Sequence, residues 1–282
     1  MFGRALGRER RVLSLNVRDW GRLIQDRSEG RLAPAGSRRK GGVGNRQVEY
    51  DLKFLLAVFN WATKAGDGEG NVFLERNPFK GFRLPKKDRP KRPRLSDKRY
   101  RAMSGVAGSV DWRFELALVL AHETGHRGSA IRQLRWSDVD LEERRIRWRA
   151  DADKQGCGHE TPMTETAARA LQRARQLHPG IGDTWVFPAP GDATKPVSRH
   201  LLRDWWKRAE RRAGLDPIPG LGWHGLRRKF ATELKGATSL KDLCALGGWK
   251  SHHTILICYQ HEDQDAMREA LERREQRLNV TA

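Results

Sequence analysis

The stretch Pro85-Lys86-Lys87-Asp88-Arg89-Pro90-Lys91-Arg92-Pro93-Arg94 divides the 282-residue chain into two parts. Its three prolines remove helix donors and its six cations repel one another, so the segment favours an extended strap. We therefore predict a helical domain over residues 1–85, a basic, proline-rich linker over 86–94 and a second domain over 95–282.

The residues before the strap carry helical patterns. Between Gln47 and Lys64, the apolar side chains of Val48, Leu52, Leu55, Leu56 and Phe59 recur at the spacing of one buried helix face. A shorter helix is predicted to include residues 17–25. Glycines and cations favour a loop over 36–44, and Asn77-Pro78-Phe79 ends the last helical stretch. The first domain is thus predicted to be helical.

The residues after the strap predict a mainly helical domain with one small sheet. Ser96 or Asp97 is suited to cap a first helix. The side chains of Ile146, Trp148 and Ala150 alternate with arginines, as in a half-exposed strand, and Gly156 and Gly158 suit a turn into a second, antiparallel strand. Further helices are predicted over 113–122, 129–134, 164–177, 198–213, 224–234 and 263–277. The fold class is therefore mainly α, with an α+β C-terminal domain.

The charge balance indicates the class of partner. The chain has 55 basic and 35 acidic residues, a formal net charge of +20, which attracts a polyanion. Nucleic acid is the leading partner, although ribosomal, membrane-surface and merely very soluble proteins can also be basic. Charge alone names no activity.

The remaining composition argues against several other classes. No apolar stretch approaches the roughly 20 residues that a bilayer span needs, and the N-terminus lacks the apolar block of a secretory signal. A cytoplasmic, nucleoid-associated protein without a membrane partner is expected. Three widely spaced cysteines offer neither a disulfide framework nor a zinc site, and the histidines lack a familiar ligand spacing. We expect neither a metal nor a cofactor.

Three segments of the second domain and one tyrosine carry the most specific signal. They are Thr124-Gly125-His126-Arg127, His224-Gly225-Leu226-Arg227, Leu246-Gly247-Gly248-Trp249 and, ten residues later, Tyr259. Their order resembles the tyrosine recombinases, the phage integrase family. Leu134-Arg135-Trp136-Ser137-Asp138 matches the segment that comes after the family's first arginine, and Lys154 lies where the family has a hairpin lysine. This resemblance spans residues 95–262, and the helical first half is similar, less specifically, to the family's core-binding domain.

The resemblance implies a catalytic site and an assembly. The catalytic residues would be Arg127, Lys154, His224, Arg227, Trp249 and Tyr259. The reaction would be site-specific cleavage and rejoining of double-stranded DNA through a 3′-phosphotyrosyl intermediate, in the integration or excision of a phage or other mobile element. Four protomers would assemble on two recombination sites, helped by accessory DNA-bending or directionality proteins, and the segment after Tyr259 would pack on a neighbouring protomer.

The residue types fit this chemistry on physical grounds. A five-coordinate phosphorus carries extra negative charge on its oxygens, and two guanidiniums, from Arg127 and Arg227, could clamp them without a metal. His224 lies three residues before Arg227, on the same helix face. The Trp249 indole can donate a hydrogen bond to phosphate. The phenol of Tyr259 has an ordinary pKa of about 10 and needs activation, while Lys154 could protonate the leaving 5′ oxygen.

Other interpretations stay open. The same site could serve a topoisomerase-like enzyme, or the chain could be a non-catalytic DNA-binding regulator. Ala130 replaces the acidic residue that the family usually has three positions after its first arginine, and the spacing from Trp249 to Tyr259 is one residue longer than in many relatives. DNA-backbone contacts are predicted for a set of basic residues: Lys86, Lys87, Arg89, Lys91, Arg92, Arg228 and Lys229.

Overall fold

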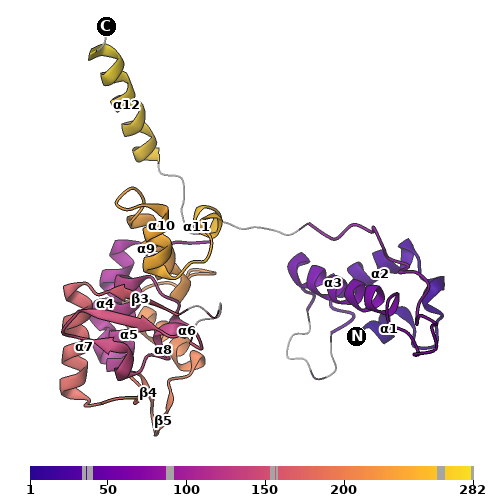
Figure 1. Cartoon of the computed structure of the whole chain (residues 1–282), viewed down its shortest axis with the longest axis horizontal. Coiled ribbons are helices and arrows are strands. Elements are labelled where there is room, and N and C mark those ends of the chain that lie inside the picture. Colours follow the sequence, from indigo (N-terminus) through magenta and orange to yellow (C-terminus); the bar gives the residue numbers. More distant parts are fainter. Residues whose placement is uncertain are drawn as a thin grey trace. The chain divides into compact units, whose positions relative to one another are not determined.

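A computed structural model describes residues 1–33, 36, 41–86, 92–152, 156, 158–258 and 264–280. The chain divides into two compact units, Met1–Lys91 and Arg92–Ala282 (Figure 1). This division falls within the stretch predicted to be a linker. Lys87, Arg89 and Lys91 lie outside the described residues.

The first unit is helical in its described residues. It contains the helices α1 (Phe2–Leu6), α2 (Val17–Ser28) and α3 (Asn45–Ala62) and the single 3-10 turn η1 (Val12–Ser14). Asn16 caps α2 by accepting a hydrogen bond from the backbone of Arg18, and the carboxylate of Asp19 accepts one from the backbone of Asn16. The helices predicted over 17–25 and 47–64 are confirmed.

The core of the first unit is aromatic. The Trp20 ring lies 4.9 Å from that of Phe79 and 6.0 Å from that of Phe82, measured between centroids. Its indole nitrogen donates to the carbonyl oxygen of Arg83 at 3.0 Å, which satisfies the polar atom of this buried ring. Val48, Leu52 and the other apolar residues of the predicted α3 stripe pack against the same core. This packing fixes the segment after α3 against α2.

The second unit begins with helices and a small sheet and ends in helices. Its elements are α4 (Asp97–Val110), α5 (Trp112–Thr124), α6 (Gly128–Ile131), η2 (Trp136–Asp138), β1 (Val139–Asp140), β2 (Arg145–Trp148), β3 (His159–Pro162), α7 (Glu165–Leu177), β4 (Pro188–Ala189), β5 (Asp192–Pro196), α8 (Arg199–Arg212), α9 (Trp223–Glu233), α10 (Leu240–Gly247), α11 (His252–Cys258) and α12 (Gln264–Val280).

Helix α5 forms the centre of the second unit. It contacts α4, α6, α7, α8 and α9, and its apolar side chains are buried almost all round. A helix that is apolar on every side is stable only inside a core. Ser96 caps α4 by accepting from the backbone of Arg99, as predicted, and Asp111 caps α5. These two caps satisfy backbone amides at the starts of both helices.

The predicted hairpin is confirmed as part of a three-stranded antiparallel sheet with the order β1-β2-β3. Trp148 pairs with His159, and Arg147 with Glu160. In the second unit, β1, the separate β4–β5 pair and the short helices α10 and α11 were not predicted, and in the first unit neither was α1. A two-residue strand is too short to show alternation. The helix predicted over 129–134 is shorter than predicted, because α6 ends at Ile131.

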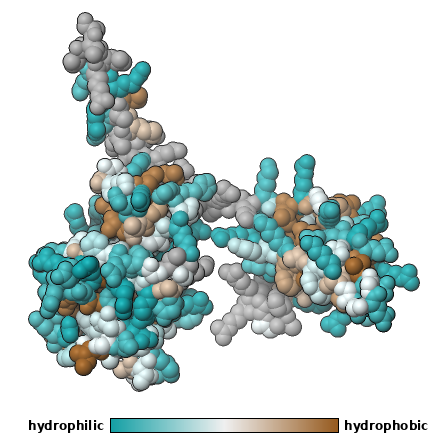
Figure 2. Space-filling view, viewed as in Figure 1, coloured by the Kyte–Doolittle hydropathy of each residue, from teal (hydrophilic) through white to brown (hydrophobic). Residues whose placement is uncertain are grey.

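The surface shows where the charge and the exposed apolar groups lie. Hydrophilic side chains cover most of the visible face of the second unit, while hydrophobic ones also reach the surface of the first (Figure 2). On α3, Tyr50, Phe54 and Trp61 are each more than half exposed. Among the described residues, no helix has both the length and the apolar character needed to span a membrane.

Candidate active site

Arg227, on α9, joins three of the sequence motifs. Its Nη1 donates to the carbonyl oxygen of Gly125 at 2.7 Å and also to that of Gly247. The guanidinium lies 3.7 Å from the centroid of the Trp249 ring, and only 1% of the residue is exposed. The arginine therefore ties the turns of both glycine motifs to α9 through charge-assisted hydrogen bonds and a cation–π contact.

Gly125 ends α5 and leads to Arg127. Its φ of 64° lies in the left-handed region, and its amide closes the helix by donating to the carbonyl of Ala121. Arg127 then occupies the N-cap position of α6 and is partly exposed. A Cβ at position 125 would overlap the ring of Phe230 on α9. Glycine is needed here for its backbone conformation and for the close approach of α9.

Substitution of this glycine is expected to weaken the domain. We expect Gly125→Ala to lower the free energy of unfolding by about 2–4 kcal/mol, from the left-handed backbone and the clash with Phe230 together. The matched control is Gly214→Ala, because Gly214 has a φ of 62° but an added Cβ would meet open space. Its loss should be about 1–2 kcal/mol. Equal losses in urea titrations of the two variants would contradict the role of the clash.

The Gly247–Gly248 turn positions Trp249. Gly248 has a φ of 62°, and the amide of Trp249 donates to the carbonyl oxygen of Cys244 at 2.9 Å. Trp249 is 5% exposed and packs with Leu243 and Ile255. Its ring is thus held by α10, α11 and the Arg227 guanidinium together.

His224 lies in the first turn of α9 with an exposed side chain. Desolvation by the surrounding protein lowers its pKa, and the charges of Arg227, Arg228, Arg127 and Arg92 lower it further. All of these influences favour the neutral imidazole, which can accept a proton. The hydrogen bond from Arg227 to Gly125 places the first two motifs next to each other, so the charges of both Arg127 and Arg227 act on His224.

Arg228 and Lys229 do not fit their predicted role as DNA contacts. They are 2% and 5% exposed. The Nε of Arg228 donates to the carbonyl oxygen of Pro93 at 2.9 Å, and the ammonium of Lys229 pairs with Asp97 and Glu233. Both side chains hold α9 to the start of the second unit and leave little surface for a phosphate, so we do not retain them as DNA contacts.

The other predicted residues divide between described and undescribed parts of the chain. Lys86 and Arg92 are exposed, and Arg92 lies close enough to His224 to affect its pKa. Lys154 and Tyr259 lie outside the described residues. In the described parts of the chain, no three histidine, cysteine or carboxylate side chains lie together in a way that could hold a metal ion.

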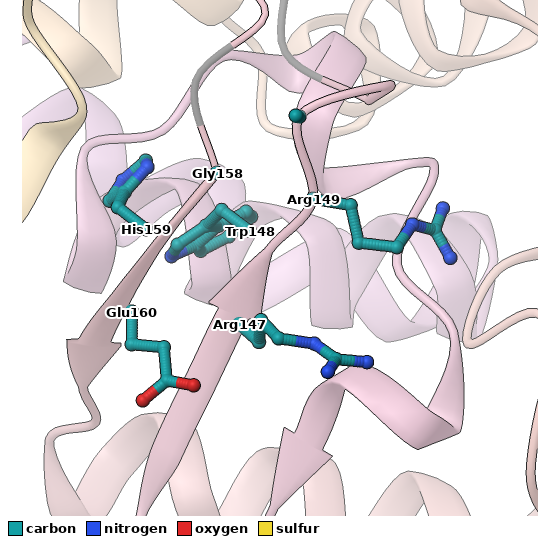
Figure 3. A pocket seen from close by; sticks show the side chains of 7 residues that line it. Arg147, Trp148, Arg149, Gly158, His159 and Glu160 are labelled. Atoms are coloured by element: carbon teal, nitrogen blue, oxygen red, sulfur yellow. The ribbon is translucent and has the colours of Figure 1, made fainter.

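The strands that flank the segment with Lys154 are anchored on one side by Asp138. This carboxylate is 4% exposed, accepts from the amide of Arg135 at 3.0 Å and pairs with Arg149 at 3.3 Å. Arg149 also donates to the carbonyl oxygen of Gln133 at 2.9 Å. Figure 3 shows Arg147 and Arg149 directed away from Trp148 and His159. The motif Leu134–Asp138 therefore supports the hairpin rather than the reacting groups.

Comparison with known proteins identifies the family. The model of the phage integrase family matches residues 93–265, more than half of the chain. A protein of Haemophilus influenzae described as an integrase/recombinase is 26% identical over 240 residues, covering 83% of this chain and 72% of that protein. The integrase of Salmonella phage P22 is 29% identical over 142 residues, covering 46% of this chain and 35% of the phage protein.

Solved structures share the fold. The Tn1549 transposon integrase in complex with a circular intermediate DNA aligns with a TM-score of 0.69 at 18% identity, covering 93% of this chain and 86% of that chain. A lambda integrase dimer bound to a COC′ core site aligns with a TM-score of 0.69 at 19% identity, covering 93% of this chain and 71% of that chain. The chain belongs to the phage integrase family, whose members are tyrosine-type site-specific recombinases.

Proposed function

We propose that this recombinase cleaves and rejoins DNA through a 3′-phosphotyrosyl bond formed by Tyr259, using Arg127, Lys154, His224, Arg227 and Trp249. The observation that carries the proposal is the position of Arg227, whose guanidinium contacts both glycine turns and the Trp249 ring. That arrangement brings the segments 124–127, 224–227 and 246–249 together, although they are far apart in sequence.

The residues of the proposed site account for every bond and proton of the cleavage step without a cofactor. The phenolic oxygen of Tyr259 attacks the phosphorus, the bond from phosphorus to the 5′ oxygen breaks, and the departing oxygen takes a proton from Lys154. The neutral His224 accepts the phenolic proton, while the charges of Arg127 and Arg227 stabilise the five-coordinate phosphorus. A 5′ hydroxyl from a second strand reverses the reaction, because the phosphotyrosyl bond conserves the energy of the broken phosphodiester.

DNA would be held mainly through its phosphates. The net charge of +20 and the basic residues Lys86, Lys87, Arg89, Lys91 and Arg92 support a backbone contact that is independent of base sequence. In the cell, the partners would be two recombination sites, four protomers of this chain and accessory DNA-bending or directionality proteins. The reaction would integrate or excise a phage or other mobile element in the cytoplasm, at the nucleoid.

The test uses DNA that carries the two ends of the element from which the sequence came. With a nicked duplex, cleavage releases a short fragment that carries the 5′ hydroxyl. The reaction then cannot reverse, so a covalent complex should accumulate. Peptide mapping of this complex should place the linked phosphate on Tyr259. Intact sites should yield recombinant junctions on sequencing. Relaxation of supercoiled DNA without junctions would favour a topoisomerase-like enzyme, and tight binding without any covalent complex would favour a non-catalytic regulator.

A further inference from the structure

Two histidines outside the proposed mechanism form a cluster at the loop end of the β2–β3 hairpin. His126 precedes Arg127 and is 4% exposed. Its ring stacks on Trp148 of β2, with centroids 3.6 Å apart and planes inclined by 8°. Its Nε2 lies 2.9 Å from the Nε2 of His159, the first residue of β3. Trp148 and His159 are register partners and lie side by side in Figure 3, so His126 bridges the two strands.

The hydrogen-bond partners determine where the protons lie. The Nδ1 of His126 is 3.0 Å from the carbonyl oxygen of Thr124, and a carbonyl oxygen can only accept. Nδ1 therefore carries the hydrogen, and the Nε2 of a neutral His126 is an acceptor. The Nε2–H of His159 must be the donor of the bond between the rings. The contacts thus fix the tautomer of a neutral His126 and require a hydrogen on the Nε2 of His159.

The surrounding charges maintain this arrangement. Burial lowers the pKa of His126 well below the ordinary value of histidine, and the neighbouring Arg227, His159 and Arg127 lower it further. Arg227 comes from α9, His159 from β3 and Arg127 from the start of α6. A neutral His126 leaves its Nε2 lone pair available to accept from His159.

The cluster also contacts the turn that carries Trp249. A Cβ on Gly248 would lie 2.6 Å from the Cε1 of His159 and 3.5 Å from the Nε2 of His126. The imidazole pair therefore lies between three segments: the Gly125–Arg127 loop, the β2–β3 strands and the Gly247–Gly248 turn. Arg227 ties the first and third of these segments together, whereas the histidine pair adds the hairpin.

We propose that His126 and His159 are positioning residues, whose hydrogen bond and shared packing on Trp148 latch the β2–β3 hairpin to the loop of Arg127 and the turn of Trp249. The latch fixes the strand ends that flank residues 153–155, and so the approach of Lys154 to the scissile phosphate. This inference rests on the proposed function, in which Lys154 protonates the leaving oxygen. Lys154 itself is not among the described residues.

The test separates loss of the latch from loss of the fold. We expect His159→Leu to slow cleavage of the nicked substrate by about 10- to 100-fold, because a displaced acid transfers its proton poorly. His159→Gln, whose amide keeps a donor near the position of Nε2, should recover most of the rate. A substrate with sulfur in place of the 5′ oxygen has a leaving group that needs no proton, and it should bring His159→Leu to within about threefold of the parent protein.

Two controls keep the outcomes distinct. Glu160→Gln changes the next residue of β3, which is exposed and faces the other side of the strand, and should cleave at the parent rate. Arg127→Ala should stay slow on the sulfur substrate, because its defect does not concern the leaving group. The latch is overturned if His159→Leu cleaves the ordinary substrate at the parent rate, or if it stays slow on the substrate with sulfur in place of the 5′ oxygen. If the parent protein forms no covalent complex, the proposed function has failed instead.

A second measurement does not depend on activity. Nitrogen-15 NMR of the imidazoles in the parent protein should show the hydrogen of His126 on Nδ1 and that of His159 on Nε2 at neutral pH. Substitution of His159 by leucine should leave the tautomer of His126 unchanged, since Thr124 still accepts from it, but should shift the resonance of its Nε2. A hydrogen on the Nε2 of His126 in the parent protein overturns the assigned bond.

Discussion

Tyr259→Phe is expected to abolish the covalent complex with DNA, while the affinity for duplex DNA stays within about twofold of the parent protein. The change removes one oxygen, the atom that would bond to phosphorus, and leaves a phenyl ring that cannot act as a nucleophile. Binding depends mainly on contacts to phosphates, which the phenyl ring does not supply. Denaturing gel electrophoresis of labelled nicked DNA measures the complex, and filter binding measures the affinity.

The other two tyrosines are the matched controls. Tyr100 stacks on His122 with centroids 3.9 Å apart, and burial, with a contribution from Glu123, raises its pKa to about 12. Its phenolate is thus harder to form than that of an ordinary tyrosine. Tyr50 lies on α3, in the other unit, beneath the guanidinium of Arg46. Tyr50→Phe and Tyr100→Phe should both retain the covalent complex. If the complex persists in Tyr259→Phe and disappears in one of these variants, the nucleophile is the tyrosine replaced in that variant.

The sequence predicted those parts of the fold that depend on local periodicity. The stripe of Val48, Leu52, Leu55 and Phe59 is the buried face of α3, and the alternation through Ile146 and Trp148 is β2. Both patterns repeat over several residues, so each side chain adds to the same signal. The two-residue strand β1 and the short helix α11 have too few residues to build a pattern, and only their tertiary partners define them.

The site was predictable as a set of residues but not as a structure. The motifs named Arg227 and Trp249, yet the contact between them and the bond from Arg227 to Gly247 depend on how α9 and α10 pack, and the bond to Gly125 joins residues about a hundred positions apart. The burial of Arg228 and Lys229, which the sequence did not indicate, has the same origin. A cation within a run of basic residues suggests a surface charge. Lys229 and Glu233 form an i, i+4 pair within α9, but the contacts of Arg228 with Pro93 and of Lys229 with Asp97 join residues more than 100 positions apart and show no local signal.

Replacing either arginine of the proposed clamp should impair catalysis, but the two replacements are expected to differ in their effect on the stability of the protein. Arg127→Ala and Arg227→Ala should each reduce cleavage by about 100- to 1,000-fold, since each removes a cation from the developing charge. Only Arg227→Ala should also lower the free energy of unfolding substantially, by about 2–5 kcal/mol, because it leaves two buried carbonyl oxygens without their donor and a void beside Trp249. Guanidinium titrations followed by tryptophan fluorescence measure this difference.

Arg227→Lys distinguishes the charge of Arg227 from its geometry. Lysine keeps the cation but has no planar fork to hold the carbonyls of Gly125 and Gly247 while lying flat on the Trp249 ring. If Arg227 acted only as a charge, the lysine variant would cleave almost normally and the pKa of His224 would stay low. We expect cleavage to remain slow, because the turns carrying Arg127 and Trp249 lose their common anchor, while the pKa of His224 stays low with lysine and rises with alanine. Near-normal cleavage by Arg227→Lys would show that position 227 contributes charge alone, and that other contacts hold the two turns together.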